Sequence, residues 1–226
     1  MNTLARIGYS ATRVVQRMGE LLTAPADLRP LMRYTMVSRR RLENLRALAE
    51  QLLAEGVPGD FVECGTWKGG SGAVLARCVE QAGADRLTWF CDSYQGLPRA
   101  GRADGWFAQL WTGQVRATPD DVRAALASVG LSDGHVRIVP GWFSDTLPTL
   151  GAETIALLHI DCDWYDSVLC CLNSLWDRVP SGGFVVFDDY GYWPGCARAA
   201  DEFLGRLGLG DALVRVDGTG YYLRKP

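Results

Sequence analysis

The spacing of apolar and polar positions changes near residue 59, and this change predicts where a sheet begins. Before that point, apolar residues recur every three or four positions, as on one face of a helix. One such stretch runs from Leu4 to Leu22 with three arginines between its apolar positions, and "APADLRP" ends it. A second helix is predicted from Ser38, a good N-terminal cap, to Gly56, a typical stop.

Beyond residue 59, short apolar runs alternate with helical patterns. The runs are continuously apolar, which is typical of parallel strands buried on both faces. One helix has a clear start, because Thr118 is a cap, Pro119 suits the first position and acids fill the first turn. The predicted strands cover residues 60–64, 87–92, 135–139, 155–161 and 183–189, and the helices cover 70–80, 118–126, 165–179 and 196–207.

The last two predicted strands, 212–217 and 220–225, are joined by "GTG" and predict an antiparallel hairpin on the sheet. We therefore expect one doubly wound α/β domain over residues 58–226, with a mostly parallel sheet, and a helical extension over residues 1–57. The N-terminal apolar stripe is longer than one domain needs, so we expect at least a homodimer. A helix on a membrane surface is the alternative. The basic run "SRRRLENLR" is expected to be a solvated face.

Composition places the chain among soluble globular proteins. Of its 226 residues, 48% are hydrophobic and 22% are charged, and 23 basic minus 26 acidic residues give a net charge of -3. This charge offers no argument for a nucleic-acid partner. No apolar run approaches the ~20 residues of a membrane span, and no signal peptide is expected. Seven cysteines without a CxxC pair favour a reducing cytoplasm.

Ligands of doubly wound sheets bind beyond the carboxyl ends of the strands. The first strand runs into "ECGTWKGGSG", where glycines allow a sharp turn and the next helix offers N–H groups to an anion. This is neither GxGxxG nor a GK[ST] phosphate loop. Glu63 in this turn and Asp92 after the second strand predict a nucleoside-bearing cofactor, although Asp92 as a simple turn residue is the alternative. After the third strand, Trp142 or Phe143 is placed to stack on a base.

Carboxylates follow the fourth and fifth strands: Asp161 after "IALLHI", and Asp188 with Asp189 after "GGFVVF". Adjacent strands lie ~4.8 Å apart, so the three acids would converge. Such a group repels itself unless a hard cation neutralises it. Oxygen ligands favour Mg²⁺, with Mn²⁺ or Ca²⁺ as alternatives. The competing interpretation is that the acids cap loops and that Asp163 caps the following helix.

Several motifs together carry a family resemblance: "YTMVS", "GDFVECGTWKGGS", "DSYQGLP", "GWFSDTLP", "IDCDWYDS" and "GGFVVFDDYGYWPGCARAADEF". In order and spacing over about residues 34–204 the chain resembles the macrocin O-methyltransferase family. It is similar, more distantly, to catechol-type methyltransferases, which usually have Asn where this chain has Asp189. The resemblance implies a class I methyltransferase domain, S-adenosylmethionine and Mg²⁺ as cofactors, and a sugar hydroxyl of a glycosylated natural product as acceptor.

The resemblance also implies roles for individual residues. Asp161 would be the base while facing the metal, and Asp188 and Asp189 would be metal ligands. Asp163 is the alternative base, and His159 is expected to be a core histidine. The residues expected around S-adenosylmethionine are Thr35, Met36, Glu63, Gly65, Thr66, Ser71, Asp92, Ser93, Trp142 and Phe143.

Three other functions compete with this one. A nicotinamide-dependent oxidoreductase is disfavoured by the missing GxGxxG and by the three acids. A non-catalytic binding module needs neither the acids nor the glycine turn, and a catechol-like acceptor remains the alternative to a sugar. The segment "RAGRADGWFAQLWTGQ" carries Trp106, Phe107 and Trp111 and is expected to contact the acceptor, unless it is a hydrophobic plug.

Overall fold

The computed structural model describes residues 19–226, which build one seven-stranded sheet in the order β3-β2-β1-β4-β5-β7-β6. Strands β1 to β5 are parallel, β7 is antiparallel to β5, and β6 is antiparallel to β7. The predicted doubly wound sheet with an antiparallel closing hairpin is confirmed. The strands are β1 (Asp60–Cys64), β2 (Thr88–Asp92), β3 (Val136–Pro140), β4 (Ile155–Ile160), β5 (Phe184–Phe187), β6 (Val214–Arg215) and β7 (Tyr221–Arg224).

Two helices have the termini that their capping residues predict. Helix α2 (Arg39–Glu55) is capped by the Ser38 side chain and ends at Gly56 in a left-handed conformation. Helix α4 (Pro119–Ala127) opens with a capping box between Thr118 and Asp121. The other α-helices that lie entirely within residues 19–226 are α3 (Gly70–Ala82), α5 (Phe143–Thr146), α6 (Tyr165–Leu175) and α7 (Pro194–Arg206).

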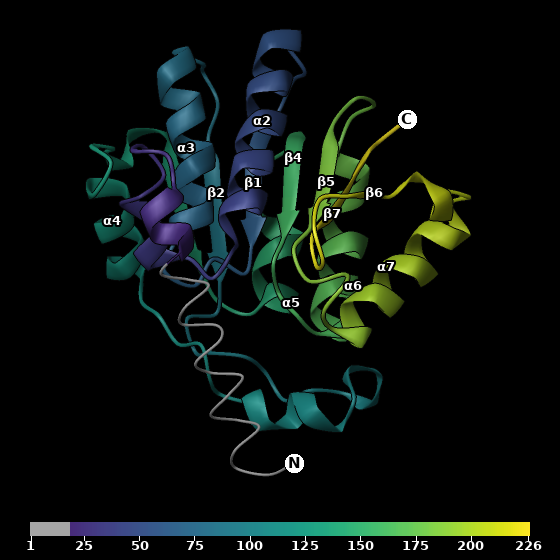
Figure 1. Cartoon of the computed structure of the whole chain (residues 1–226). Coiled ribbons are helices and arrows are strands. Elements are labelled where there is room, and N and C mark those ends of the chain that lie inside the picture. The colour runs from purple at the N-terminus through teal and green to yellow at the C-terminus, as the bar shows by residue number, and fades with distance from the viewer. Residues whose placement is uncertain (1–18) are drawn as a thin grey trace.

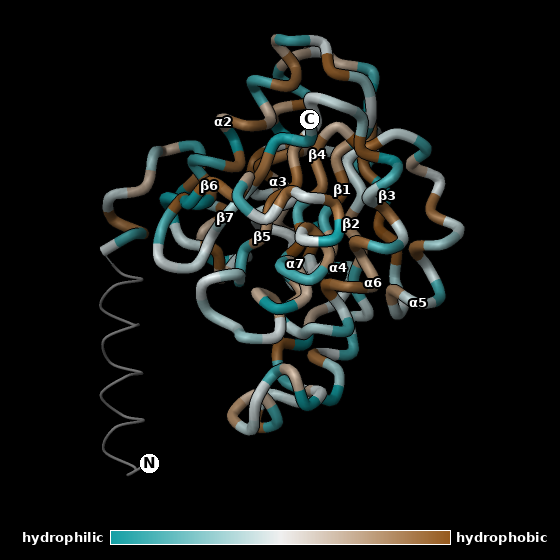
Figure 2. The backbone as a smooth tube through the Cα atoms, turned by 90° about the vertical axis from the view of Figure 1, so that its right-hand side faces the viewer, coloured by the Kyte–Doolittle hydropathy of each residue, from teal (hydrophilic) through white to brown (hydrophobic). Residues whose placement is uncertain are grey.

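Helices cover both faces of the sheet (Figure 1). On one face, buried leucines of α2 and α3 pack with Phe61, Leu157 and Phe184. On the other face, α6 and α7 pack with Val62, Leu158 and other residues of alternate parity. Figure 2 shows apolar residues concentrated in the central strands. Since both faces of the sheet are covered, a ligand can reach it at the carboxyl ends of the strands, where the polar residues lie.

Some elements differ from the prediction. The closing strands are shorter than expected: β6 is the edge strand of the sheet, and β7 lies between β5 and β6. Helix α7 starts two residues early, at Pro194. Most of the Leu4–Leu22 stripe lies outside the described residues, so the dimer and the division of domains at residue 57 stay predictions. Within residues 19–226, no helix combines the length and apolar composition needed to cross a bilayer.

Candidate active site

The predicted site residues lie along one edge of the sheet because the hydrogen-bond ladder continues past the strand ends. Asp161 N–H donates to Cys64 O at 2.8 Å, and Asp188 N–H donates to Ile160 O at 3.0 Å. On the other side of β1, Gly65 N–H donates to Cys91 O, and Gly141 N–H donates to Asp92 O, both at 2.9 Å. The turn after β1 is thus a direct neighbour of the acid after β4.

The glycine turn between β1 and α3 packs tightly against this acid. Gly65 has φ +92°, and a methyl group there would overlap the carbonyl oxygen of Asp161. Thr66 and Ser71 are buried in the same turn. The hydroxyl of Thr66 and Oε2 of Glu63 have no hydrogen-bond partner among the described residues. Unpaired buried polar atoms beside a glycine turn and a helix N-terminus fit a polar ligand bound here.

Asp92 organises the loops around this turn. Its Oδ2 accepts the N–H of Trp67 at 2.8 Å and its Oδ1 accepts the N–H of Tyr94 at 2.7 Å. Both donors have positive φ, 46° and 56°, so the carboxylate stabilises two strained positions. Burial raises the pKa of Asp92, although these hydrogen bonds oppose the shift. Asp92 therefore is a turn residue, and its binding of a ribose stays a prediction, as does a role for Ser93, whose hydroxyl accepts the N–H of Gln95 at 3.1 Å.

The other predicted cofactor residues surround the same crevice. A methyl group at Gly70 would lie 2.8 Å from Cβ of Thr35, so the segment before α2 lies directly on the glycine turn. Next to it, Met36 is 58% exposed. After β3, Trp142 is exposed, whereas Phe143 packs against the core. Trp142 is thus free to stack on a base, and Phe143 is less so.

Two of the three strand-end acids lie close together. Among residues 19–226, one group offers metal-ligand atoms all within 4.8 Å of one another: His159, Asp161 and Asp188. Asp189 is not part of this group, but its carboxylate shares a hydrogen bond with Asp161, and its Oδ2 has no partner among the described residues. Burial and the neighbouring carboxylates raise the pKa of Asp161 and of Asp189 well above the usual range. An oxygen-rich donor set with repelling charges and an unpaired oxygen fits a hard divalent cation.

His159 is the core histidine that the sequence predicted, yet it also contacts the acids. Its Nδ1 lies 3.0 Å from Oε1 of Glu63, and its Nε2 lies 3.9 Å from Oδ1 of Asp188. Burial would lower its pKa, but the nearby carboxylate of Asp188 and the hydrogen bond with Glu63 outweigh it and raise the pKa to about 10. Glu63 lies near the end of β1, and its side chain is fully buried. Through His159 it is in contact with the group of Asp161 and Asp188, and it lies just before the glycine turn.

Arg41 is a residue of this site that the sequence did not predict. The run "SRRRLENLR" was expected to be a solvated face, and this is wrong for Arg41, although Arg40 is exposed. The side chain of Arg41 is only 15% exposed and pairs with Asp188 and, at 3.3 Å, with Asp217. Helical spacing was the available signal, because Arg41 lies four positions before the buried Leu45.

The competing interpretation, in which Asp163 caps α6, is wrong. The N-cap of α6 is Trp164, without a side-chain cap, and the N–H of Tyr165 donates to Oδ1 of Asp104 at 2.7 Å. Asp163 itself has φ +61° and shares a hydrogen bond with Trp193. Burial raises its pKa to about 7. Asp163 is therefore held in a strained conformation beside aromatic side chains, without serving the helix.

Aromatic side chains gather next to Asp163. Trp193 stands 4.8 Å from Trp164, 6.2 Å from Phe107 and 6.3 Å from Trp111, measured between ring centroids. Phe107 and Trp111 come from the short helix η3 (Trp106–Trp111), in the teal segment that projects beyond the strand ends in Figure 1. They pack against the core as a plug would, whereas Trp106 is 75% exposed. The segment therefore packs against the core through Phe107 and Trp111 and presents Trp106 to the solvent.

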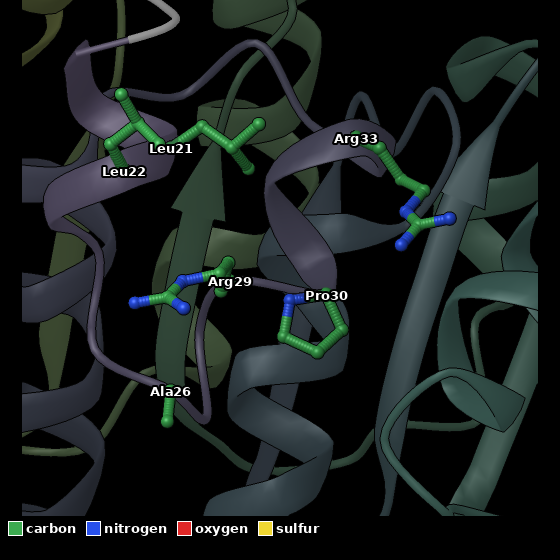
Figure 3. A pocket seen from close by; sticks show the side chains of 6 residues that line it. All are labelled: Leu21, Leu22, Ala26, Arg29, Pro30 and Arg33. Carbon is green, nitrogen blue, oxygen red and sulfur yellow. The ribbon is translucent and has the colours of Figure 1, made fainter.

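A pocket of about 440 Å³ lies elsewhere, in the segment before α2 (Figure 3). None of the strand-end acids lines it. Its lining residues are Leu21, Leu22, Ala26, Arg29, Pro30 and Arg33.

The strand order, the glycine turn after β1 and the acids after β4 and β5 define a class I methyltransferase domain. The chain belongs to the macrocin O-methyltransferase family, whose model, described as Macrocin-O-methyltransferase (TylF), matches residues 8–225. The fold and the family predicted from the sequence are confirmed.

Known relatives agree with this assignment. A protein of Streptomyces olivaceus, 8-demethyl-8-(2,3-dimethoxy-alpha-L-rhamnosyl)-tetracenomycin-C 4'-O-methyltransferase, is 40% identical over 202 residues, covering 86% of this chain and 77% of that protein. Demethyldecarbamoylnovobiocin O-methyltransferase of Streptomyces niveus is 37% identical over 204 residues, with 87% and 77% covered. Among solved structures, the O-methyltransferase NovP superimposes with a TM-score of 0.79 at 37% identity, covering 85% of this chain and 82% of that one.

Proposed function

We propose that this chain transfers the methyl group of S-adenosylmethionine to a hydroxyl on a sugar of a glycosylated natural product, with Mg²⁺ at the strand-end acids. The observation that carries the proposal is the convergence of Asp161 and Asp188 beside the glycine turn. The names of the relatives, which include an enzyme acting at a rhamnosyl group, support the acceptor class. A cytoplasmic location and a homodimer are part of the same proposal.

The chain's own residues divide the work. In this proposal, Glu63, Thr66 and Ser71, which are buried at the glycine turn, would hold the amino-acid end of the cofactor, and Asp92 with Trp142 would hold its nucleoside. Asp161, Asp188 and Asp189 would hold Mg²⁺, which supplies Lewis-acid activation of the acceptor hydroxyl. In the reaction the acceptor oxygen forms a bond to the methyl carbon while the bond from that carbon to sulfur breaks, and a carboxylate accepts the hydroxyl proton.

Two carboxylates are candidates for that proton. We propose Asp161, which lies at the end of β4 in the group with Asp188. Asp163 is the second candidate, because its hydrogen bond with Trp193 places it on the side of the aromatic segment. Both lie near Asp188, but only Asp161 belongs to the group of candidate metal ligands, whereas Asp163 contacts Trp193.

The test compares Asp161→Asn and Asp163→Asn in methyl transfer to a panel of glycosylated natural products and catechols. Asp161→Asn should abolish turnover and weaken Mg²⁺ binding while sparing S-adenosylhomocysteine affinity, and EDTA should reproduce this loss in the wild type. If Asp163 is the base, its variant loses turnover with Mg²⁺ affinity intact. Normal turnover of Asp161→Asn, or activity insensitive to EDTA, would contradict the metal proposal. A preference for catechols would contradict the acceptor class.

A further inference from the structure

Arg41 contacts Asp188, one of the acids of the proposed metal site. Its guanidinium contacts Oδ2 of Asp188 through Nη1, and the same nitrogen donates to the Asp188 carbonyl oxygen at 3.0 Å. The other oxygen of the carboxylate, Oδ1, lies 3.9 Å from Nε2 of His159, a member of the group with Asp161. The two oxygens of Asp188 therefore have different neighbours, which restrains rotation of the carboxylate.

Arg41 is itself held at a second point. Its Nε donates to the hydroxyl of Ser38 at 3.2 Å and pairs with Oδ2 of Asp217 at 3.3 Å. Ser38 in turn donates to the same carboxylate at 2.9 Å. Asp217 is fixed by N–H groups of its own hairpin turn between β6 and β7, from Thr219 at 2.9 Å and Gly220 at 2.8 Å. The arginine thus links the first turn of α2, the closing hairpin and the end of β5.

We propose that Arg41 is a positioning residue for the metal site, which keeps Oδ1 of Asp188 turned toward His159, a member of the group with Asp161, and available as a ligand atom. A carboxylate that binds a metal is commonly oriented by a hydrogen-bond donor behind it, and loss of such a donor typically lowers metal affinity by about 10- to 100-fold. The planar guanidinium of arginine suits this task, since its nitrogens are held in a fixed geometry. Nη1 contacts the side chain and the carbonyl oxygen of Asp188, while Nε contacts Ser38 and Asp217. This inference rests on the proposed function, because it needs the metal.

The opposite effect is the rival explanation. A cation beside the acids repels a second cation, so removal of Arg41 would then strengthen metal binding. The contacts with Ser38 and Asp217 argue against this explanation, because they hold the guanidinium at the start of α2 and prevent it from moving into the metal site. The sign of the change in metal affinity distinguishes the two.

The experiment titrates Mn²⁺ into the full chain with saturating S-adenosylhomocysteine and follows free Mn²⁺ by electron paramagnetic resonance. Arg41→Gln should bind Mn²⁺ about 10- to 100-fold more weakly than the wild type. Arg41→Lys should give an intermediate loss, because it keeps the charge without the fork. The exposed neighbour Arg40→Gln is the matched control and should bind like the wild type.

Affinity for S-adenosylhomocysteine without metal reports whether each variant is folded. Equal or tighter Mn²⁺ binding by Arg41→Gln, with that affinity intact, overturns the inference. If Arg41→Gln also loses affinity for S-adenosylhomocysteine, the Arg41→Lys variant is used in its place. Weaker Mn²⁺ binding by Arg41→Lys supports the inference, and unchanged binding overturns it. A wild type that binds no Mn²⁺ overturns the metal site of the proposed function and this inference with it.

Discussion

Removing the carboxylate of Asp104 should loosen the aromatic segment that we propose as the acceptor contact. Asp104 is 3% exposed and joins two parts of the chain that are distant in sequence. Its Oδ1 accepts the N–H of Tyr165 at 2.7 Å, and its Oδ2 accepts the N–H of Gly101 at 2.7 Å. Asp104→Ala would leave both donors without this partner.

The size of the effect follows from these two bonds. A buried donor left unpaired costs about 1–3 kcal/mol, and a carboxylate at the N-terminus of a helix such as α6 adds about 0.3–1 kcal/mol. Releasing a buried charge offsets part of this sum. We therefore expect Asp104→Ala to lower the free energy of unfolding by about 2–4 kcal/mol.

Urea denaturation measures this loss, and acceptor KM and S-adenosylhomocysteine affinity show where it acts. We expect Asp104→Ala to raise the KM for the acceptor and to leave the affinity for S-adenosylhomocysteine unchanged. Gly195→Ala should act in the same direction, since its methyl group would overlap Oδ1 of Asp104. The exposed Asp211→Ala should change stability by less than about 0.5 kcal/mol. A loss below about 1 kcal/mol for Asp104→Ala, or equal effects on both ligands, would refute the reasoning.

Three further predictions concern single positions. Gly65→Ala should cost more stability and nucleoside affinity than Gly83→Ala, because both glycines have positive φ but only Gly65 faces the Asp161 carbonyl; equal losses in thermal unfolding would contradict this. Burial would raise the pKa of Asp217, but hydrogen bonds from Gly220 and Thr219 and the charge of Arg41 lower it, so its stabilisation is lost as pH falls through the folded value. Asp217→Asn should therefore flatten the fall in Tm below about pH 4, and parallel acid limbs would exclude the effect. Trp106→Ala, at a 75% exposed side chain, should raise the acceptor KM with a stability change within about 0.5 kcal/mol, whereas an unchanged KM would remove Trp106 from the acceptor site.

Local chemistry explains which parts of the fold the sequence predicted. The start of α4 at Thr118 and Pro119 and the end of α2 at Gly56 depend on neighbouring residues alone, so both predictions were correct. The convergence of Asp161 and Asp188 followed from strand ends that are adjacent in a parallel sheet.

The missed contacts are those between distant segments. Asp104 precedes its partner Tyr165 by 61 positions, and nothing local distinguishes it from other loop acids. Arg41 and Asp188 are separated by 147 positions, and the basic run around Arg41 concealed its inward side. In each case a charged side chain is buried because it contacts a partner from a distant segment. The spacing of apolar and polar residues within one segment does not reveal that partner.

The ladder that joins Cys64 to Asp161 has a consequence for how enzymes of this kind diversify. The spacing between the glycine turn and the acid after β4 is set by the backbone repeat of the sheet, so exchanges of side chains leave it unchanged. The aromatic segment, by contrast, is attached through side chains: the hydrogen bonds of Asp104, ring contacts and the buried Ala100 and Ala108. A segment of another length or composition, transplanted with its own buried carboxylate, should therefore redirect the enzyme to a new acceptor without retuning the reacting centre.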